Sequence, residues 1–404
     1  MPAIDRMGLG QLVRMAFNGV DLLPLWRRLS ERAVDGTADA GALLDLSLVA
    51  QLAASKDVGL AIQEQVLAVH RLFRLPCSSE NPRLRVLALA AAIDMGGNTP
   101  IECLLEDADI ELQTLYVVPG THLPSPLPEH DIAIVIASDS AECRPALEEI
   151  DRLAPHWPRP ILNLPCSIAN LDRDKLYRLL NGIEGIDMPA TVGCSRVQLT
   201  DIALGMMSVT DFGDDIAFPI IVRPRGSHAG VGLAKLDDAE ALFGYLDGRT
   251  EDEFFISRFV DYSSEDGQFR KYRIVAVDGK PFACHMAIAD QWNIWYLNAG
   301  MAQSEDKRLE EATFMYTFNF GFALRHGKAL SNMIERIGLD YFVVDCAENK
   351  NGDLVIFEAD NTAVVHNMDS PETFPYKPPQ MRMIFEAFVA MLLRRAQQEQ
   401  QCAA

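Results

Sequence analysis

The chain has 404 residues, of which 49% are hydrophobic and 23% charged, and its formal net charge is −21. This length allows about two or three compact units, and the composition is that of a soluble globular protein. The acidic balance disfavours a nucleic acid or an anionic membrane surface as a partner, because both bind basic faces. ATP stays compatible, since a few local cations can bind it.

The eight cysteines are scattered singly without a C-x-x-C pair, which argues against a zinc ribbon or a redox motif and indicates a reducing compartment. The first residues lack the apolar segment of a signal peptide. No run approaches the roughly 18 apolar residues of a membrane-spanning helix. We therefore expect a cytoplasmic protein that does not enter a membrane.

Residues 1–75 are predicted to be helical, because apolar residues recur at helical spacing over 43–52 and 62–73. The stretch 38–73 resembles one tetratricopeptide-like hairpin, although a solenoid needs about three repeats. Two interpretations stay open for this segment. It forms a groove for a protein partner, or it is a helical cap packed on the rest of the chain.

Strands alternate with helices over residues 83–168, which predicts a small parallel α/β unit. Neither G-x-G-x-x-G nor G-x-x-x-x-G-K-[ST] occurs, so a dinucleotide site and a P-loop are not indicated. The expected strands are 84–93, 112–118, 131–137 and 160–164, and the expected helices are 101–108 and 144–153.

The second half mixes helices with strands and contains a hairpin that turns at Asp278-Gly279, a strong turn signal. The expected helices are 171–181, 197–206, 237–246, 307–314, 326–337 and 381–398. The expected strands are 218–222, 254–261, 272–277, 281–289, 341–346 and 354–359.

Residues 218–235 read FPIIVRPRGSHAGVGLAK, an apolar strand followed by cations and three glycines. Glycine lets the backbone approach an anion, and successive N–H groups can bind phosphate. Taken alone, the stretch also fits an ordinary hairpin. His228 contacts phosphate or substrate, or is simply exposed. The candidate nucleotide-binding residues here are Arg223, Arg225, Gly226, Ser227, His228, Gly230 and Gly232.

Three carboxylates interrupt apolar strands, Asp345 in FVVDCA and Glu358 and Asp360 in LVIFEAD. Glu358 and Asp360 are two residues apart, so both face one side of an extended strand. Carboxylates are costly to bury without a cation, and Mg²⁺ prefers oxygen ligands. The alternative is solvated carboxylates on an edge strand. Lys175, Arg223, Arg225 and Arg273 are cations on separate elements that could converge on one cleft.

Residues 161–391 resemble the ATP-grasp family of carboxylate–amine ligases, and the α/β unit before them looks like that family's pre-grasp domain. The matching features follow the family's order: Asp174-Lys175 with Pro189 downstream, Ile221-Val222-Arg223-Pro224 before the glycine-rich loop, 255–261, 272–277, Asp345, and Phe357-Glu358-Ala359-Asp360-Asn361.

The resemblance implies an ATP-grasp fold of the α/β and α+β classes. Its expected parts are a helical extension at 1–75, a pre-grasp α/β domain at 83–168, a central lid subdomain at 169–260 and a C-terminal catalytic subdomain at 261–398.

It also implies roles for single residues. Lys175 helps to hold phosphate, and the glycine-rich loop is a lid. The hinge that cups adenine includes Arg258, Phe259 and Asp261. Arg273 is catalytic, and Asp345, Glu358 and Asp360 hold Mg²⁺. Asn298 is a further catalytic candidate in an aromatic stretch that lines a substrate pocket or belongs to the core.

Four departures from the family pattern place the chain in a divergent branch. Arg223 stands where lysine is usual, and Lys271 stands where an acid usually precedes the arginine. Ser257-Arg258 lies near the position of a hinge acid or amide. Asp360 replaces asparagine as the third metal ligand, which is a mild change.

The expected function is an ATP- and Mg²⁺-dependent ligase that joins a carboxylate to an amine through an acyl phosphate. The substrates would be small molecules or peptides. A phosphotransferase on the same fold and a non-catalytic ATP-sensing adaptor are the alternatives. A homodimer and a protein partner at residues 1–75 stay open.

Overall fold

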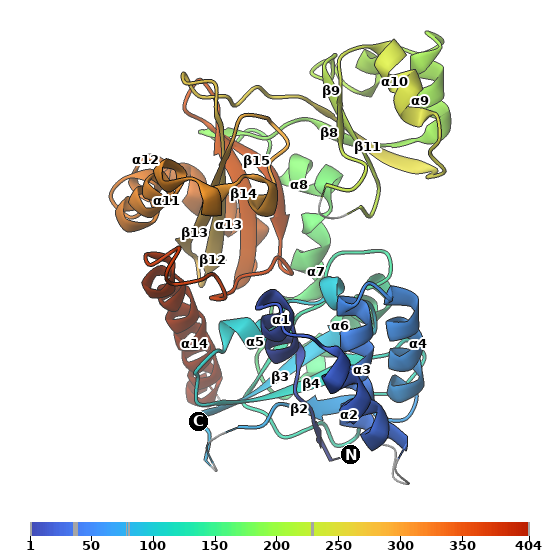
Figure 1. The fold of residues 1–404 in the computed structure, drawn as a ribbon, viewed down its shortest axis with the longest axis vertical. Helices are drawn as coiled ribbons and strands as arrows, with labels where there is room; N and C mark the ends of the chain where they lie inside the picture. The colour runs from blue at the N-terminus through green and yellow to red at the C-terminus, as the bar shows by residue number, and fades with distance from the viewer. Residues whose placement is uncertain (1, 35–38, 78, 80, 228–229, 403–404) are drawn as a thin grey trace. The chain divides into compact units, whose positions relative to one another are not determined.

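A computed structural model describes residues 2–34, 39–77, 79, 81–227 and 230–402. The chain forms two compact units (Figure 1). The first consists of Met1–Ala169, Leu339–Phe342 and Asp360–Ala404, and the second of Asn170–Gly338 and Val343–Ala359. The predicted combination of α/β and α+β structure is confirmed.

The first unit is built on a six-stranded sheet of order β1-β2-β4-β3-β5-β6. Four strands run parallel, as the alternation of strands and helices predicts. β2 runs antiparallel to β4, and β1 runs parallel to β2. The strands are β1 (Ile4–Asp5), β2 (Leu72–Arg74), β3 (Leu84–Ala91), β4 (Ile110–Val117), β5 (Ile132–Val135) and β6 (Ile161–Leu162).

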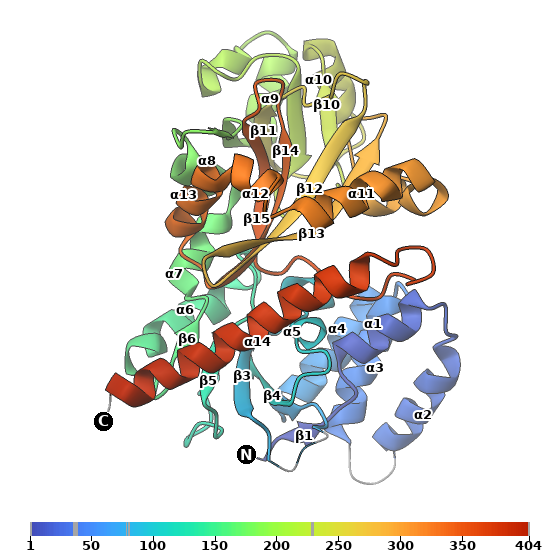
Figure 2. The same cartoon turned by 90° about the vertical axis from the view of Figure 1, so that its left-hand side faces the viewer.

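The helices of this unit are α1 (Leu9–Phe17), α2 (Leu23–Val34), α3 (Ala40–Leu52), α4 (Lys56–Leu67), α5 (Ile101–Leu104), α6 (Arg144–Leu153), α7 (Pro165–Ile168) and α14 (Lys377–Cys402). α3 is buried over most of its length, between α2 and α4. α14 packs against α5 and β5 (Figure 2). Arg395 of α14 pairs with Asp340, 2.7 Å away, and Asn163 hydrogen-bonds the backbone N–H and C=O of Tyr341.

The helices expected within residues 1–75 form, and the predicted hairpin corresponds to α3 and α4. The chain then turns into β2, so the prediction that the second helix reaches residue 73 is wrong. Phe73 is fully buried and β2 is paired with β1 and β4. Through β1 and β2, this segment contributes two strands to the sheet of the first unit.

A buried ion pair holds the start of the chain in the first unit. Arg6 Nη2 lies 2.9 Å from Glu102 Oε1, with side-chain exposures of 5% and 7%. Asp45, on α3, is buried and accepts hydrogen bonds from the backbone N–H groups of Met7 and Gly8. The chain from β1 to α1 is therefore fixed by charged groups that lie far away in the sequence.

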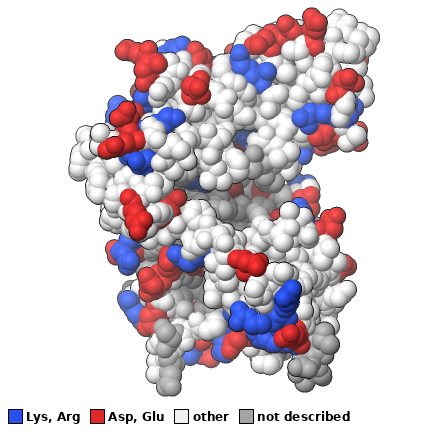
Figure 3. All heavy atoms as spheres, in the orientation of Figure 1, with Lys and Arg blue, Asp and Glu red and all other residues white. Residues whose placement is uncertain are grey.

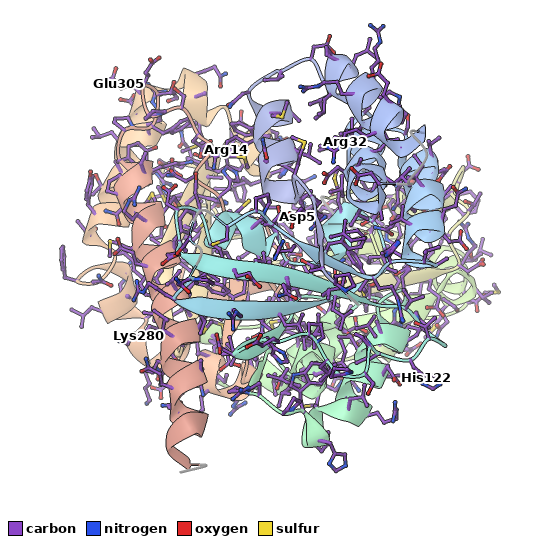
Figure 4. All side chains as sticks on the ribbon, turned by 90° about the horizontal axis from the view of Figure 1, so that it is seen from below. Asp5, Arg14, Arg32, His122, Lys280 and Glu305 are labelled. Carbon is purple, nitrogen blue, oxygen red and sulfur yellow. The ribbon has the colours of Figure 1, made fainter. Side chains whose placement is uncertain are left out.

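Exposed ion pairs add to this attachment. Asp5 and Arg14, both labelled in Figure 4, pair with Arg74 at 2.9 Å and with Glu106 at 2.5 Å. Acidic and basic side chains are interspersed over the face shown in Figure 3. Among the described helices, none is both long enough and apolar enough to cross a membrane.

The second unit contains an antiparallel four-stranded sheet of order β10-β9-β11-β8. Its strands are β8 (Thr191–Ser195), β9 (Ile220–Pro224), β10 (Ala234–Leu236) and β11 (Glu253–Arg258). The helices α9 (Arg196–Ala203) and α10 (Ala239–Leu246) bury leucine and isoleucine side chains against this sheet. Asp238 caps α10 by accepting a 2.8 Å hydrogen bond from the N–H of Ala241.

A five-stranded sheet of order β13-β12-β14-β15-β7 completes the second unit. The Asp278-Gly279 turn is confirmed, with φ of 52° and 79° at its two residues. The strands are β7 (Ile186–Asp187), β12 (Phe269–Val277), β13 (Lys280–Ala289), β14 (Tyr341–Glu348) and β15 (Leu354–Asp360). The helices are α8 (Arg173–Leu180), α11 (Glu305–Thr317), α12 (Phe322–Arg325) and α13 (Gly327–Ile337), with 3₁₀ turns at Tyr296–Asn298 and Met301–Gln303.

Candidate active site

Charged side chains from five elements gather in the second unit, and we call them the charge cluster. Four are cations and two are carboxylates: Arg173 on α8, Arg223 on β9, Lys271 and Arg273 on β12, Asp345 on β14, and Glu358 on β15. Adjacent strands of the five-stranded sheet carry all but Arg173 and Arg223. With every group ionised, the cluster has an excess of positive charge.

Asp345 is the most buried member, with 2% of its side chain exposed. Arg273 binds it through both carboxylate oxygens, with Nε 2.8 Å from Oδ1 and Nη2 3.0 Å from Oδ2, and Lys271 Nζ lies 2.7 Å from Oδ2. Lys271 and Arg273 are two residues apart in a strand, so both face Asp345. Burial alone would raise the pKa of Asp345, but these two cations outweigh it and hold the pKa well below its usual range.

Glu358 is held by a different cation. Its carboxylate pairs with Arg173, whose Nη1 also donates a 2.9 Å hydrogen bond to the backbone C=O of Phe357. Burial would raise the pKa of Glu358, but the charge of Arg173 outweighs it and lowers the pKa. Arg223 lies within the field of both groups, and burial together with the charge of Arg173 lowers its pKa to about 10. The surroundings of Arg223 therefore do not fully compensate its positive charge.

The glycine-rich loop starts beside this cluster. Arg223 donates hydrogen bonds to the side chain and the backbone C=O of Ser227. Gly226, Gly230 and Gly232 have φ of 73°, 74° and 71°, which side chains rarely adopt. At Gly232 a Cβ would also lie 2.7 Å from Pro224 Cδ. The backbone therefore requires glycine here, as a loop that approaches a ligand does. His228 lies outside the described residues.

Two of the predicted phosphate cations are more exposed. Arg225 pairs with Asp172 at 2.8 Å and stacks over the ring of Phe255 at 5.1 Å. Lys175 is exposed on α8, whereas Arg173, two positions earlier, contacts Glu358. Residues two apart on a helix lie on different faces. Arg173 therefore belongs to the charge cluster, and the phosphate-binding role of Lys175 stays a prediction.

The predicted adenine hinge follows β11. Arg258 pairs with Asp187 at 2.5 Å, and the ring of Phe259 lies 4.9 Å from Lys235 Nζ. Asp261 pairs with Lys350 at 2.5 Å, and the hydrogen bond from Lys350 lowers the pKa of Asp261 to about 2. These contacts fix the hinge within the second unit, and its role in cupping adenine stays a prediction.

Asn298 closes a local turn. Its Oδ1 accepts a 2.9 Å hydrogen bond from the N–H of Trp295, and its Nδ2 donates a 3.3 Å bond to the C=O of Asn293. Both sides of the amide therefore serve the 3₁₀ turn at 296–298. A catalytic role for Asn298 stays a prediction.

The predicted Mg²⁺ ligands do not form a metal site in this structure. Asp345 and Glu358 face cations, and Asp360 Oδ1 accepts hydrogen bonds from the N–H and Oγ1 of Thr362, at 2.6 and 2.8 Å. Across the described ranges, no three His, Cys, Asp or Glu side chains are grouped so that they could hold a metal ion. The donor set does not fit Mg²⁺, because fixed cations already neutralise its two central carboxylates.

Arg173 was not among the predicted site residues, and Lys271 was noted only as a departure from the family pattern. A signal for Arg173 was present, because it is the first residue of the helix that contains Lys175 and lies on a different face of that helix from Lys175. A signal for Lys271 was its spacing of two from Arg273, which places both on one side of β12. In neither case does the sequence reveal the distant carboxylate partner.

Comparisons with known proteins gave matches among solved structures. No family model matches the chain, and no curated protein matches it. Solved structures similar to it include a RimK domain ATP-grasp protein from Sphaerobacter thermophilus, 18% identical, with a TM-score of 0.41 over 76% of this chain and 99% of that one.

Two others are D-alanine–D-alanine ligase from Bacillus anthracis complexed with ATP, and the ATP-grasp ligase PsnB with a precursor peptide and AMPPNP. They are 14% and 10% identical, with TM-scores of 0.48 and 0.42, and each match covers 78% of this chain and 99% of the other. Two of these three similar structures, the RimK domain protein and PsnB, are described as ATP-grasp proteins.

Proposed function

We propose that this protein is an ATP-dependent ligase that joins a carboxylate to an amine and releases ADP and phosphate. The observation that supports this most directly is the charge cluster beside a glycine-rich loop. A triphosphate needs several cations on separate elements and a backbone that it can approach closely. The second unit provides both features together.

The cations would act by position and charge. Arg223 leads into the glycine-rich loop, Arg173 projects from α8, and Arg273 is held rigidly by two hydrogen bonds to Asp345. Such preorganised donors stabilise the charge that develops on a transferring phosphoryl group without reorganising during the reaction.

The reaction would proceed in two steps. A carboxylate oxygen of the acid substrate forms a bond to the γ-phosphorus of ATP as the bond to the β–γ bridging oxygen breaks, which gives an acyl phosphate and ADP. The amine nitrogen then forms a bond to the acyl carbon, and the bond between that carbon and the phosphate oxygen breaks. The products are an amide, inorganic phosphate and a proton lost from the amine. Both steps depend on holding the reactants together in a closed site.

Two further expectations belong to this proposal, and two alternative functions compete with it. The acid and the amine are small molecules or peptides, and the reaction takes place in the cytoplasm. A phosphotransferase would use the same cluster but pass the phosphoryl group to a hydroxyl or a stable acid. A non-catalytic adaptor would bind ATP and transmit its presence to a partner at residues 1–75.

Isotope transfer distinguishes these reactions. The protein is incubated with ATP, a panel of acids carrying ¹⁸O in the carboxylate, and a panel of amines, and the released phosphate is analysed by mass spectrometry. One labelled oxygen in inorganic phosphate, with an amide and ADP, supports the ligase. A stable phosphorylated product without an amide favours the phosphotransferase. AMP and pyrophosphate would overturn both, and bound but unconsumed ATP that alters partner binding would favour the adaptor.

A pair of arginines on α8 tests the role of the charge cluster. Arg173→Met should lower kcat/KM for ATP turnover about hundredfold, because it removes a fixed cation from the site. Arg178→Met is the matched control, since Arg178 is exposed and pairs only within its own helix with Asp174. The control should stay within about twofold of the unaltered protein. Equal losses in the two variants would show that α8 acts through stability alone.

A further inference from the structure

Lys271 and Arg173 contact the two carboxylates that, in the resembled family, would hold Mg²⁺. Lys271 Nζ lies 2.7 Å from Asp345 Oδ2, and Arg173 pairs with Glu358. Arg273 engages both oxygens of Asp345 in addition. A divalent cation would have to displace these fixed charges or share the carboxylates with them.

The charge balance makes such displacement unfavourable. A metal ion binds where carboxylates outnumber cations, since burying like charges together raises the free energy of the site. The charge cluster has four cations for two carboxylates, and it therefore lacks negative charge. Burial lowers the pKa of Arg223, and the nearby charge of Arg173 lowers it further.

The side chains that form these contacts are mostly shielded from solvent. The side chains of Lys271, Arg273 and Arg173 are each only 21–23% exposed, and Asp345 is 2% exposed. The two β12 cations are fixed by the sheet, because β12 neighbours β14. Lys271 stands where the resembled family usually has an acid, so this position carries a positive charge in place of a negative one.

We propose that Lys271 and Arg173 substitute for divalent metal at this site, so that the charge cluster binds a nucleoside triphosphate directly, without Mg²⁺. The proposal rests on the proposed function only in assigning the nucleotide to this cluster. It differs from the family expectation in the source of positive charge. The ligand is a free polyphosphate, and the protein supplies the neutralising cations.

The test compares nucleotide affinity with and without divalent metal. Isothermal titration calorimetry measures the Kd of AMPPNP for the full chain in EDTA and again in MgCl₂, at the same ionic strength, because salt screens such contacts. We expect the Kd in EDTA to be no more than about threefold weaker than in Mg²⁺, since the charge is built into the protein.

Lys271→Met should change this behaviour. Loss of one cation should weaken binding in EDTA by about tenfold or more, and Mg²⁺ should restore most of that loss. Lys328→Met is the control, because Lys328 forms an exposed ion pair with Glu184 in the same unit. The control should behave like the unaltered protein in both buffers. Thermal unfolding establishes that both variants are folded.

The outcomes separate the two proposals. Binding by the unaltered protein that needs Mg²⁺, with a Kd more than about tenfold weaker in EDTA, overturns metal substitution and leaves the ligase proposal intact. A variant Lys271→Met that matches Lys328→Met in both buffers overturns the role of Lys271. Absence of AMPPNP binding in both buffers removes the nucleotide site, and with it both the ligase proposal and this inference.

Discussion

Replacing Asp345 by asparagine should lower the free energy of unfolding by about 3–5 kcal/mol, the usual effect of removing one partner of a buried ion pair. Asp345 is 2% exposed and forms ion pairs with both Arg273 and Lys271. Asparagine has nearly the same shape, so the loss would come from leaving two neighbouring cations without their anion. Chemical denaturation, followed by circular dichroism, measures the difference.

Asp261→Asn provides the matched control for this prediction. Asp261 also pairs with a lysine, Lys350, but both side chains are largely exposed, at 47% and 61%. Exposed pairs contribute between about 0 and 1 kcal/mol, so this variant should unfold almost like the unaltered protein. If Asp345→Asn proved equally stable, the contacts of Asp345 would have to be weaker than their distances indicate, and a site for another ligand would gain support.

Arg6→Met should destabilise the first unit by about 3–5 kcal/mol, because it removes the cation of a buried ion pair. Arg6 is buried against Glu102, and the methionine would leave that carboxylate, and Asp45 nearby, without a cation. Arg74→Met is the control, because Arg74 forms an exposed pair with Asp5 on the same strand pair. Thermal unfolding should separate the two variants clearly.

The pH dependence of Arg6→Met gives a second signature. Burial raises the pKa of Asp45, and the charge of Arg6 opposes that increase. Without Arg6 the pKa should rise further, and a carboxyl whose pKa is raised by folding favours the folded state at low pH and opposes it as pH rises through that value. The variant should therefore be closer to the unaltered protein at about pH 5 than at about pH 8. An equal difference at both pH values would mean that the buried carboxylates do not cause the loss.

Local signals explain which parts of the fold could be predicted. Helix α6 forms over the predicted residues 144–153, because its amphipathic period is regular. The Asp278-Gly279 turn follows from the backbone preferences of two residues. The strands β1 and β8 were missed because short strands are defined by partners far away in the chain. β10 was missed because it is only three residues long, although its partner β9 lies nearby in the chain. β2 was assigned to a helix because Leu72 and Phe73 also fit a helical pattern of apolar residues.

The candidate site divides in the same way. The sequence placed Arg273, Asp345 and Glu358 in strands, and their order along the chain indicated that they would belong together. It could not indicate that Lys271 and Arg273 would both bind Asp345, or that Arg173 would bind Glu358, because those contacts join residues from distant parts of the chain. The residues of a metal site and of a cation-neutralised site are the same types, so only their pairing distinguishes the two.

The division of the first unit among three stretches has a consequence for biosynthesis. Leu339–Phe342 and Asp360–Ala404 belong to this unit, and the contacts of Asn163 with Tyr341 and of Arg395 with Asp340 join those stretches to it or to each other. Every residue of the second unit leaves the ribosome before residue 360 does. We therefore expect the second unit to finish folding first. The N-terminal part of the first unit, up to Ala169, would complete its fold only after α14 has been synthesised and covers its apolar surface. A nascent chain stalled after residue 359 would then hold a complete second unit beside an unfinished first one, a state that chaperones recognise by its exposed apolar surface.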